Sequence, residues 1–228
     1  ATNSTTQPIN VGGVVGYNAG VVLSCKNSKD ILAYQSVGGI VGYNAGTLLG
    51  DVINVAGSDL TVGNVYYKLE KTDNGQSVEE FEYTGDGSTE NVTYYQKQTG
   101  VSATGSVTGA INVGGAVGYA AEDSKIFAVN SSANVSGNTN VGGLVGLAGN
   151  NSTISNNSVN FSTSVESTGN NTESTNSETP QQTTVVVKGI FVHNYVSVKD
   201  GENEKSTSYY MLPTSVGGLI GSTAKNKV

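Results

Sequence analysis

The sequence predicts an all-β fold, namely a right-handed β-solenoid (β-helix-like) with two β-hairpin inserts. A six-residue pattern, Val-Gly-Gly-x-[Val/Ile]-Gly, occurs five times in the 228 residues, which is typical of a stacked repeat protein. Helices are not expected, because 31 glycines and many β-branched residues disfavour helix interiors. The apolar residues also lack the i, i+3, i+4, i+7 spacing of an amphipathic helix.

The spacing of the repeats suggests the coils of a solenoid. The leading valines are separated by 26, 76, 28 and 75 residues, and a step of 26 or 28 fits one coil. These residues are Val11, Val37, Val113, Val141 and Val216. We therefore expect a single repeat domain, 1–228, with coils at 11–36, 37–64, 113–140, 141–165 and 216–228.

Each coil is expected to hold three short strands joined by turns. In the first coil we predict strands at 13–17, 21–25 and 31–34. The repeat pattern would place apolar residues and glycines on both faces of one strand, which indicates that both faces are covered, as in a parallel sheet. Glycine at these positions permits the close approach of a second backbone.

The two long steps are interpreted as coils that carry inserts. The first insert, 65–99, contains an Asn74-Gly75 turn between alternating strands, which is a strong hairpin signal. The second insert, 185–212, contains a turn at Asp200-Gly201. The segment 162–184 that precedes it is almost wholly polar, and we predict that it is a flexible surface loop.

Composition limits the classes of function. Charged residues make up 13% of the chain, against about 25% in ordinary soluble domains, and small polar residues take their place, which is typical of an exported protein. The net charge of −7 argues against a nucleic-acid partner. No stretch reaches the ~20 apolar residues of a membrane span. A chain that begins at Ala1 fits a processed product or a fragment.

The residues of the fourth repeat resemble a known motif. The run NVSGNTNVGGLVG at 134–146, followed by TISNN at 153–157, is similar to the GLUG motif of bacterial surface proteins, which include large adhesins and cell-surface peptidases. The resemblance covers all five repeats and leaves out both inserts. It implies an extracellular location at the bacterial cell surface. It implies no activity, because in peptidases the motif is accessory to the catalytic domain.

The sequence offers few residues for a catalytic or metal-binding site. His193 is the only histidine, so a Ser-His-Asp triad or a zinc site lacks its partners. Cys25 is the only cysteine and lies in an apolar run, which favours a small core residue over a reactive thiol. The turns at Asp86-Gly87 and 200–204 lack the ligand spacing of an EF-hand. We expect no cofactor and no metal.

Paired carboxylates are the remaining catalytic candidates, because some parallel β-helix proteins cleave polysaccharides and glycosidases need two carboxyl groups. The candidates are Asp51, Asp59, Asp123 and the acidic segment 79–82. In that segment acidic residues alternate with Phe81, as on the solvent face of a half-buried strand. The 11 Lys and Arg residues also form no dense cluster that could bind an acidic polysaccharide. We therefore predict that the chain is not an enzyme.

Tyrosine pairs in the inserts are candidates for contact with a partner or a glycan. Because neighbours on a strand point to opposite faces, we expect one tyrosine of each pair to pack on the solenoid and the other to be exposed. Two interpretations stay open, a lid over the glycine-rich face and a contact surface for carbohydrate or a second subunit. The residues are Tyr66, Tyr67, Tyr94, Tyr95, Tyr209 and Tyr210.

Asn-x-[Ser/Thr] sequences are frequent in the second half of the chain, although many arise from composition alone. They make N-glycosylation a candidate modification if the host supplies it. The candidate acceptors are Asn130, Asn134, Asn151, Asn156 and Asn160.

The ends of the repeat array predict self-assembly. A solenoid normally ends in a polar cap that protects its strand edges, and the sequence shows no cap at either end. If Ala1 of a second copy followed Val228, the next repeat valine would come 23 residues after Val216, close to one coil. We expect residues 1–10 of a neighbour to complete the last half-coil by strand addition and to build head-to-tail filaments. The expected interface residues are Asn10, Val11, Val216, Leu219 and Ile220.

These observations favour a non-enzymatic, extracellular structural or adhesive surface protein that assembles with itself. One alternative is a carbohydrate-binding or accessory module of a larger secreted enzyme, with surface glycans as partners. A less favoured alternative is a β-helix enzyme that degrades polysaccharides. The uncapped ends fit a fragment of a longer array equally well.

Overall fold

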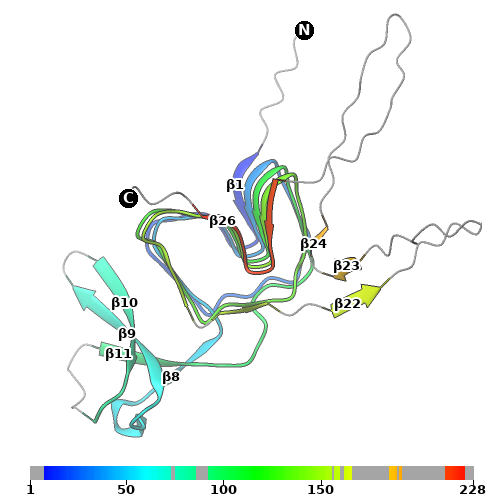
Figure 1. Ribbon diagram of the computed structural model, residues 1–228. Coiled ribbons are helices and arrows are strands. Elements are labelled where there is room, and N and C mark those ends of the chain that lie inside the picture. Colours follow the sequence, from blue (N-terminus) through cyan, green and yellow to red (C-terminus); the bar gives the residue numbers. More distant parts are fainter. Residues whose placement is uncertain are drawn as a thin grey trace, which may run out of the picture.

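The computed structural model describes residues 8–72, 75–85, 92–155, 157–159, 162–165, 185–188, 190–191 and 214–223. Within these residues the fold is all-β, as predicted, and the single helical element is a 3-10 turn, η1 (Gly57–Asp59). The main body consists of parallel sheets in which successive coils of the chain lie one behind another (Figure 1).

Two of the parallel sheets have five strands each and meet at the notch near the labels β1 and β26 in Figure 1. Sheet 1 consists of β1 (Ile9–Gly12), β5 (Gln35–Gly38), β13 (Ile111–Gly114), β18 (Thr139–Gly142) and β25 (Thr214–Gly217). Sheet 2 consists of β2 (Val15–Asn18), β6 (Val41–Asn44), β14 (Val117–Ala120), β19 (Val145–Ala148) and β26 (Ile220–Thr223).

Two further parallel sheets have four strands each and close the other sides of the body. Sheet 3 consists of β3 (Val21–Leu23), β7 (Thr47–Leu49), β15 (Lys125–Phe127) and β20 (Thr153–Ser155). Sheet 4 consists of β4 (Ile31–Leu32), β12 (Ser106–Thr108), β17 (Asn134–Ser136) and β24 (Ile190–Phe191). A short parallel pair, β16 (Asn130–Ser131) and β21 (Ser158–Val159), lies between them in the chain.

The strand register follows the sequence repeat. Val11 pairs with Val37, Val37 with Val113, Val113 with Val141, and Val141 with Val216. The chain between two paired valines is short in some coils and carries a long insert in others. The register is therefore the same at every coil, whatever the length of the connection.

The repeat pattern forms a sharp corner instead of the single strand expected from the sequence. In the first coil Val11 and Gly12 end β1, Gly13 and Val14 form a bend, and Val15 begins β2. The first coil therefore contains four strands, β1 to β4, where three were predicted. The corner depends on glycine, because a Cβ on Gly12 would lie 2.6 Å from the backbone oxygen of Ile40 in the next coil.

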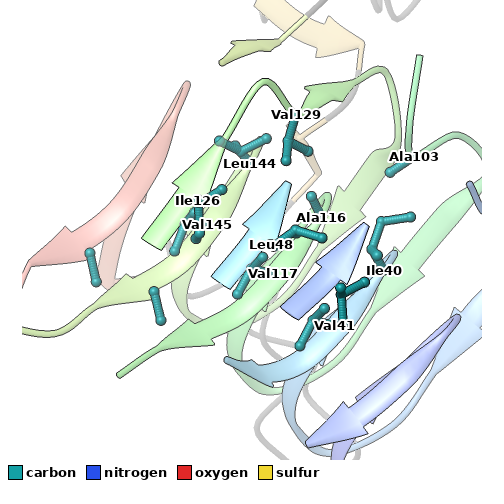
Figure 2. Close-up of a cluster of buried hydrophobic side chains, with 13 residues drawn as sticks. Ile40, Val41, Leu48, Ala103, Ala116, Val117, Ile126, Val129, Leu144 and Val145 are labelled. Atoms are coloured by element: carbon teal, nitrogen blue, oxygen red, sulfur yellow. The ribbon is translucent and has the colours of Figure 1, made fainter. Parts of the chain in front are cut away.

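Apolar side chains fill the interior in two clusters. The larger cluster lies between sheets 2 and 3 and includes the corner residue of each inner coil (Figure 2). Its labelled members are Ile40, Val41, Leu48, Ala103, Ala116, Val117, Ile126, Val129, Leu144 and Val145. The second cluster, between sheets 1 and 4, contains Val37, Val107, Val113, Ala133, Val135 and Val141.

Buried asparagines stabilise the short turn that follows sheet 2 in the first two coils. Asn18 Nδ2 donates a hydrogen bond to Asn44 Oδ1 at 2.7 Å, and Asn18 Oδ1 accepts one from the backbone N–H of Gly20 at 3.0 Å. Asn44 is 0% exposed, and its Nδ2 donates to the backbone oxygens of Gly46 (3.1 Å) and Lys125 (3.3 Å). The amides therefore satisfy backbone groups that the tight turn leaves unpaired.

The first insert forms an antiparallel sheet, which we call the insert sheet. Its strands, in spatial order, are β10 (Gly75–Glu82), β9 (Val65–Thr72), β11 (Val92–Lys97) and β8 (Val52–Val55). β9 and β10 form the hairpin that the sequence predicts there. The insert sheet packs on the outer face of sheet 3, where the rings of Tyr67 and Phe127 lie 5.6 Å apart. It does not cover the glycine-rich corner, so the expectation of a lid over that face is wrong for the first insert.

The second insert is described only at its first strands. β22 (Ser162–Val165) pairs antiparallel with β23 (Val185–Lys188), so the start of the predicted loop is a strand. The rest of 162–184, and the predicted turn at Asp200-Gly201, lie outside the described residues.

Candidate functional site

The two ends of the stack differ from its interior at one core position, the fourth residue of the repeat pattern. Within the described part of the chain, the three inner residues are 0% exposed, whereas the first is 43% and the last 40% exposed. In chain order these residues are Val14, Ile40, Ala116, Leu144 and Leu219. No further coil among the described residues covers the two end residues.

Backbone hydrogen bonds join this position from coil to coil in one direction. Val14 N–H donates to Ile40 O at 3.0 Å, and Ile40 N–H donates to Ala116 O at 2.9 Å. At the last junction Leu144 and Val145 both donate to Leu219 O, at 3.0 and 3.1 Å. At this corner position, therefore, the N–H groups face the following coil and the carbonyl oxygens face the preceding one.

Sheets 1 and 2 meet at the notch through glycines, with no side chain between their backbones. We call this contact the glycine seam. A Cβ on Gly146 of sheet 2 would lie 2.5 Å from the backbone nitrogen of Val113 in the previous coil. A Cβ on Gly221 would lie 2.6 Å from the nitrogen of Val141, also in the previous coil. These glycines of sheet 2 thus lie directly against the backbone of the coil before them.

In the part of the chain that the structure describes, the glycine seam is open at both ends. Gly16 in the first coil would place its Cβ within 4 Å of one residue only, Asn10 of its own coil, with Asn10 O at 2.7 Å. Gly217 in the last coil has its three nearest atoms on Ile220 and Gly221, which belong to its own coil. At the equivalent Gly142, by contrast, a Cβ would lie 2.7 Å from the backbone nitrogen of Gly221 in the next coil. Each end therefore presents half of a contact that inner coils complete.

The structure places the residues predicted for self-assembly at these two ends. Asn10 and Val11 lie on β1, the edge strand of sheet 1 in the first coil. Val216 lies on β25, the opposite edge of the same sheet, and Leu219 and Ile220 follow at the last corner. Because β1 already pairs with β5, it can offer a neighbour only its free edge, and residues 1–7 lie outside the described residues.

Left-handed residues precede the repeat valines, a feature that the sequence reasoning missed. The available signal was an Asn or Ser directly before each valine. Asn adopts the left-handed backbone region more readily than most residues do. Asn140 Nδ2 also donates to Asn112 Oδ1 at 2.8 Å, so these side chains bond along the stack. The residues are Asn10, Ser36, Asn112, Asn140 and Ser215, with φ between 52° and 61°.

The tyrosine pairs of the first insert do not form an exposed surface. Tyr66 is 2% exposed and Tyr67 0%, so the expectation that one of each pair is exposed is wrong here. Tyr67 faces sheet 3, while Tyr66 faces Phe81 at 6.2 Å and accepts a hydrogen bond from Thr61 N–H at 3.0 Å. Near Tyr66 the chain before β9 covers the outer side of the insert sheet, whereas Glu79 on the same side is exposed.

The second pair of the insert sheet is also largely covered. Tyr94 is buried, and its ring lies 5.8 Å from that of Phe81. Tyr95 is half-buried and packs against the cluster beneath the insert sheet. Tyr209 and Tyr210 lie outside the described residues.

A tyrosine ladder that is half-buried along its length and exposed at one end occurs instead on sheet 2. Tyr17, Tyr43 and Tyr119 follow the repeat pattern directly in its first three copies, which was the available sequence signal. The rings of Tyr17 and Tyr43 stack at 5.2 Å, and those of Tyr43 and Tyr119 meet edge to face at 4.9 Å. Partial burial, with the neighbouring phenols Tyr119 and Tyr17, raises the pKa of Tyr43. Tyr17, at the end of the ladder, is 58% exposed.

The candidate carboxylates serve structural contacts. Asp51 forms an ion pair with Lys26 at 2.8 Å, and Glu80 accepts a hydrogen bond from Ser155 Oγ at 3.1 Å. The hydrogen bond from Lys68 Nζ, at 2.8 Å, lowers the pKa of Glu79. A glycosidase acid needs a raised pKa, so Glu79 is tuned in the wrong direction for that role.

The other catalytic candidates remain apart. Asp59 ends η1 and Asp123 lies in an exposed turn with φ 58°. Cys25 packs against the larger apolar cluster, and its Sγ donates to Leu23 O at 3.3 Å. His193 and the two candidate calcium turns lie outside the described residues. Among the residues that the structure describes, no group of three or more His, Cys, Asp or Glu side chains could hold a metal ion.

The candidate glycosylation sites divide by exposure. Asn130 is 5% exposed, its Nδ2 donates to Gly100 O at 2.8 Å, and its Oδ1 accepts from Ser158 Oγ at 2.6 Å. A folded chain therefore cannot offer Asn130 as an acceptor, and that expectation is wrong. Asn134 and Asn151 are exposed. Asn156 and Asn160 lie outside the described residues.

Comparisons with protein-family models, with curated proteins and with solved structures found no match. In the described part of the chain, no helix is both long and apolar enough to cross a membrane.

Proposed function

We propose that this chain is a non-enzymatic structural or adhesive protein of the bacterial cell surface, whose copies assemble head to tail by strand addition. The resemblance to the GLUG motif supports the extracellular location. We also propose that the coils form a right-handed solenoid, because parallel strands joined by crossover connections follow a right-handed path in nearly all proteins.

The exposure of Val14 and Leu219 carries the proposal. Each occupies a position that is fully buried in the inner coils, and each is large and apolar. Burying an apolar side chain of this size stabilises an assembly by about 1.5–3 kcal/mol relative to leaving it in water. Stacking a last coil on a first coil would bury both residues at once.

Strand edges at the same two ends support the proposal. β1 and β25 are the outer strands of sheet 1, and β2 and β26 are the outer strands of sheet 2. An exposed parallel edge is a template for another strand, and stable proteins usually cover it. A contact between opposite ends of the same molecule does not close on itself, so it generates filaments.

Complementary end variants test the proposal. Val14→Asp places a charge on the first coil only, and Leu219→Asp on the last coil only. Each variant alone should stay monomeric in analytical ultracentrifugation, because burying an unpaired carboxylate is costly. An equimolar mixture should form dimers, because one intact face of each variant remains. Negative-stain microscopy of the unsubstituted protein should show filaments.

The matched control is Val62→Asp, which changes a valine that is 65% exposed but lies in the insert, away from both ends. This variant should assemble as the unsubstituted protein does. Filaments of Val14→Asp alone, or a mixture of the two end variants that stays monomeric, would overturn the proposed assembly.

A carbohydrate-binding role is the second candidate, and the partly exposed ladder of Tyr17, Tyr43 and Tyr119 favours it. Aromatic side chains supply large amphipathic contact surfaces at binding interfaces. Titration with cell-surface glycans should then change tyrosine fluorescence, and Tyr17→Ala should reduce the change. Glycan binding that survives this substitution, or no binding at all, would argue against the ladder as the site.

A further inference from the structure

We infer that the partner of each end is a second copy of this chain stacked in the register of the internal coils, so that the two open halves of the glycine seam close on each other. This inference rests on the proposed head-to-tail assembly and specifies its geometry. In it, Gly16 of the following copy lies against Ser215 and Val216, as Gly118 lies against Ser36 and Val37.

The internal junctions show that this register does not depend on chain connection. Val11 and Val37 are joined by a short coil, and Val37 and Val113 by a coil that carries the whole insert sheet. Both pairs nevertheless align residue for residue. The strands and the glycine seam therefore set the register, and a junction between two chains needs no covalent link to reproduce it.

The internal pattern also defines the contacts of the junction. In sheet 1, Val216 would pair with Val11 of the following copy, continuing the series of repeat valines. In sheet 2, Ile220 would pair with Val15, and Ser222 with Tyr17, as Val145 pairs with Ile220 and Leu147 with Ser222.

The direction of the hydrogen bonds at the corner decides which of its backbone groups meet. Leu144 and Val145 donate their backbone N–H groups to Leu219 O. By the same rule Leu219 and Ile220 would donate to Val14 O of the following copy. The side chain of Leu219 would then cover that of Val14 and continue the buried series of the inner coils.

Glycine makes the register selective. A strand shifted by one residue reverses the faces of all its side chains. At this junction a one-residue shift would bring Val15 or Tyr17 to the place of Gly16, where inner coils have no room even for a Cβ. Only the internal register keeps a glycine against the neighbouring backbone along the whole seam.

The described strands at the two faces carry no charged residue, since they read INVG, VGYN, TSVG and IGST. The junction therefore depends on apolar burial and backbone hydrogen bonds. We expect assembly to be nearly insensitive to salt, because screening acts on charged pairs.

Disulfide trapping tests the register in assembled protein. In a Cys25→Ala background, a chain with Ser222→Cys and Tyr17→Cys should form covalent multimers on oxidation. Neighbouring strands lie about 4.8 Å apart, within the Cα separation of about 4.4–6.8 Å that a disulfide spans. The matched control combines Ser222→Cys with Val15→Cys, which lies two residues along β2 and faces the interior, and it should not crosslink.

Failure of this inference is distinguishable from failure of the proposed assembly. Filaments that crosslink through Val15→Cys, or not at all, would overturn the register and leave head-to-tail assembly standing. Gly16→Ala supplies a second measurement, and it should raise the concentration needed for assembly about tenfold or more, since the seam cannot accept the methyl group. Folding of this variant is followed separately by circular dichroism of the monomer. Assembly of folded Gly16→Ala at the unsubstituted concentration would contradict a closed seam.

Discussion

Replacing Gly118 by alanine should strongly destabilise the chain, although alanine is usually the better residue outside turns. Gly118 lies in β14 in the middle of the glycine seam and is fully buried. A Cβ there would lie 2.7 Å from Gly42 O, and closer still to Ser36 C and Val37 N. All three are backbone atoms of the previous coil, so no side chain can rotate away.

The magnitude follows from two opposing effects. Alanine restricts the unfolded chain more than glycine does, and this stabilises the folded state by about 0.4–1 kcal/mol where alanine can adopt the native backbone conformation. Overpacking a rigid interior costs about 1–3 kcal/mol and sometimes more, because the backbone has to move. We expect the overpacking to dominate, with a net loss of about 2 kcal/mol. In a chain of this length that loss lowers Tm by about 4–8 °C.

Two other glycines calibrate the measurement. A Cβ on Gly20 meets nothing within 4 Å, so Gly20→Ala should leave stability unchanged or raise it slightly. Gly16 lies at the open end of the seam, where a Cβ meets only Asn10, so Gly16→Ala should fall between the other two. Thermal and urea unfolding should be followed by circular dichroism at a concentration where the chain is monomeric, because assembly would raise the apparent stability. A Gly118→Ala variant as stable as Gly20→Ala would refute the close contact of sheets 1 and 2.

Three further predictions concern other parts of the chain. Asn44→Ala should lower the free energy of unfolding by about 1–3 kcal/mol in urea titrations, because it removes one of the two acceptors of the buried Asn18 amide and the donor to Gly46 O and Lys125 O; an unchanged midpoint would contradict this. In a glycosylating host, peptide mass spectrometry should find glycan on Asn134 and none on Asn130, and a modified Asn130 in folded protein would argue against its burial. The raised pKa of Tyr43 means that its contribution to stability is complete below the ordinary pKa of 10.0 and is lost as the pH rises through the folded value. Ultraviolet titration of the phenols should lose a late-ionising tyrosine when Tyr43 is replaced by phenylalanine, and a titration unchanged by that substitution would contradict the shift.

Local pattern was enough to predict the β class and one hairpin. Frequent glycine and β-branched residues exclude helix through backbone and side-chain entropy, which act within a few residues of the chain. The turn at Asn74-Gly75 is likewise a local preference, and β9 and β10 pair on either side of it. The five repeat valines marked positions that pair with one another in sheet 1, because stacked coils repeat the same environment.

The path of the backbone at the repeat was not predictable from the pattern alone. Val-Gly-Gly-x-Val-Gly reads as one strand, yet it forms the end of β1, a bend and the start of β2. The deciding contact is between coils, since Gly12 packs against the backbone of Ile40 and Gly42 in the next coil. A sequence pattern of six residues contains no information about that neighbour.

The sequence by itself determined that this chain forms strands, that it repeats, and which residues are equivalent from coil to coil. Only the tertiary structure decided which faces are covered. Tyr66 and Tyr67 alternate on β9 as strand neighbours must, but contacts with Phe81 and Phe127 bury both. Burial depends on segments that are distant in the sequence. The alternation of side chains within one strand cannot predict where those segments lie. The same reason applies to Val14 and Leu219, which occupy the same place in the repeat pattern as buried residues. Only the order of the stacked coils shows that these two are exposed.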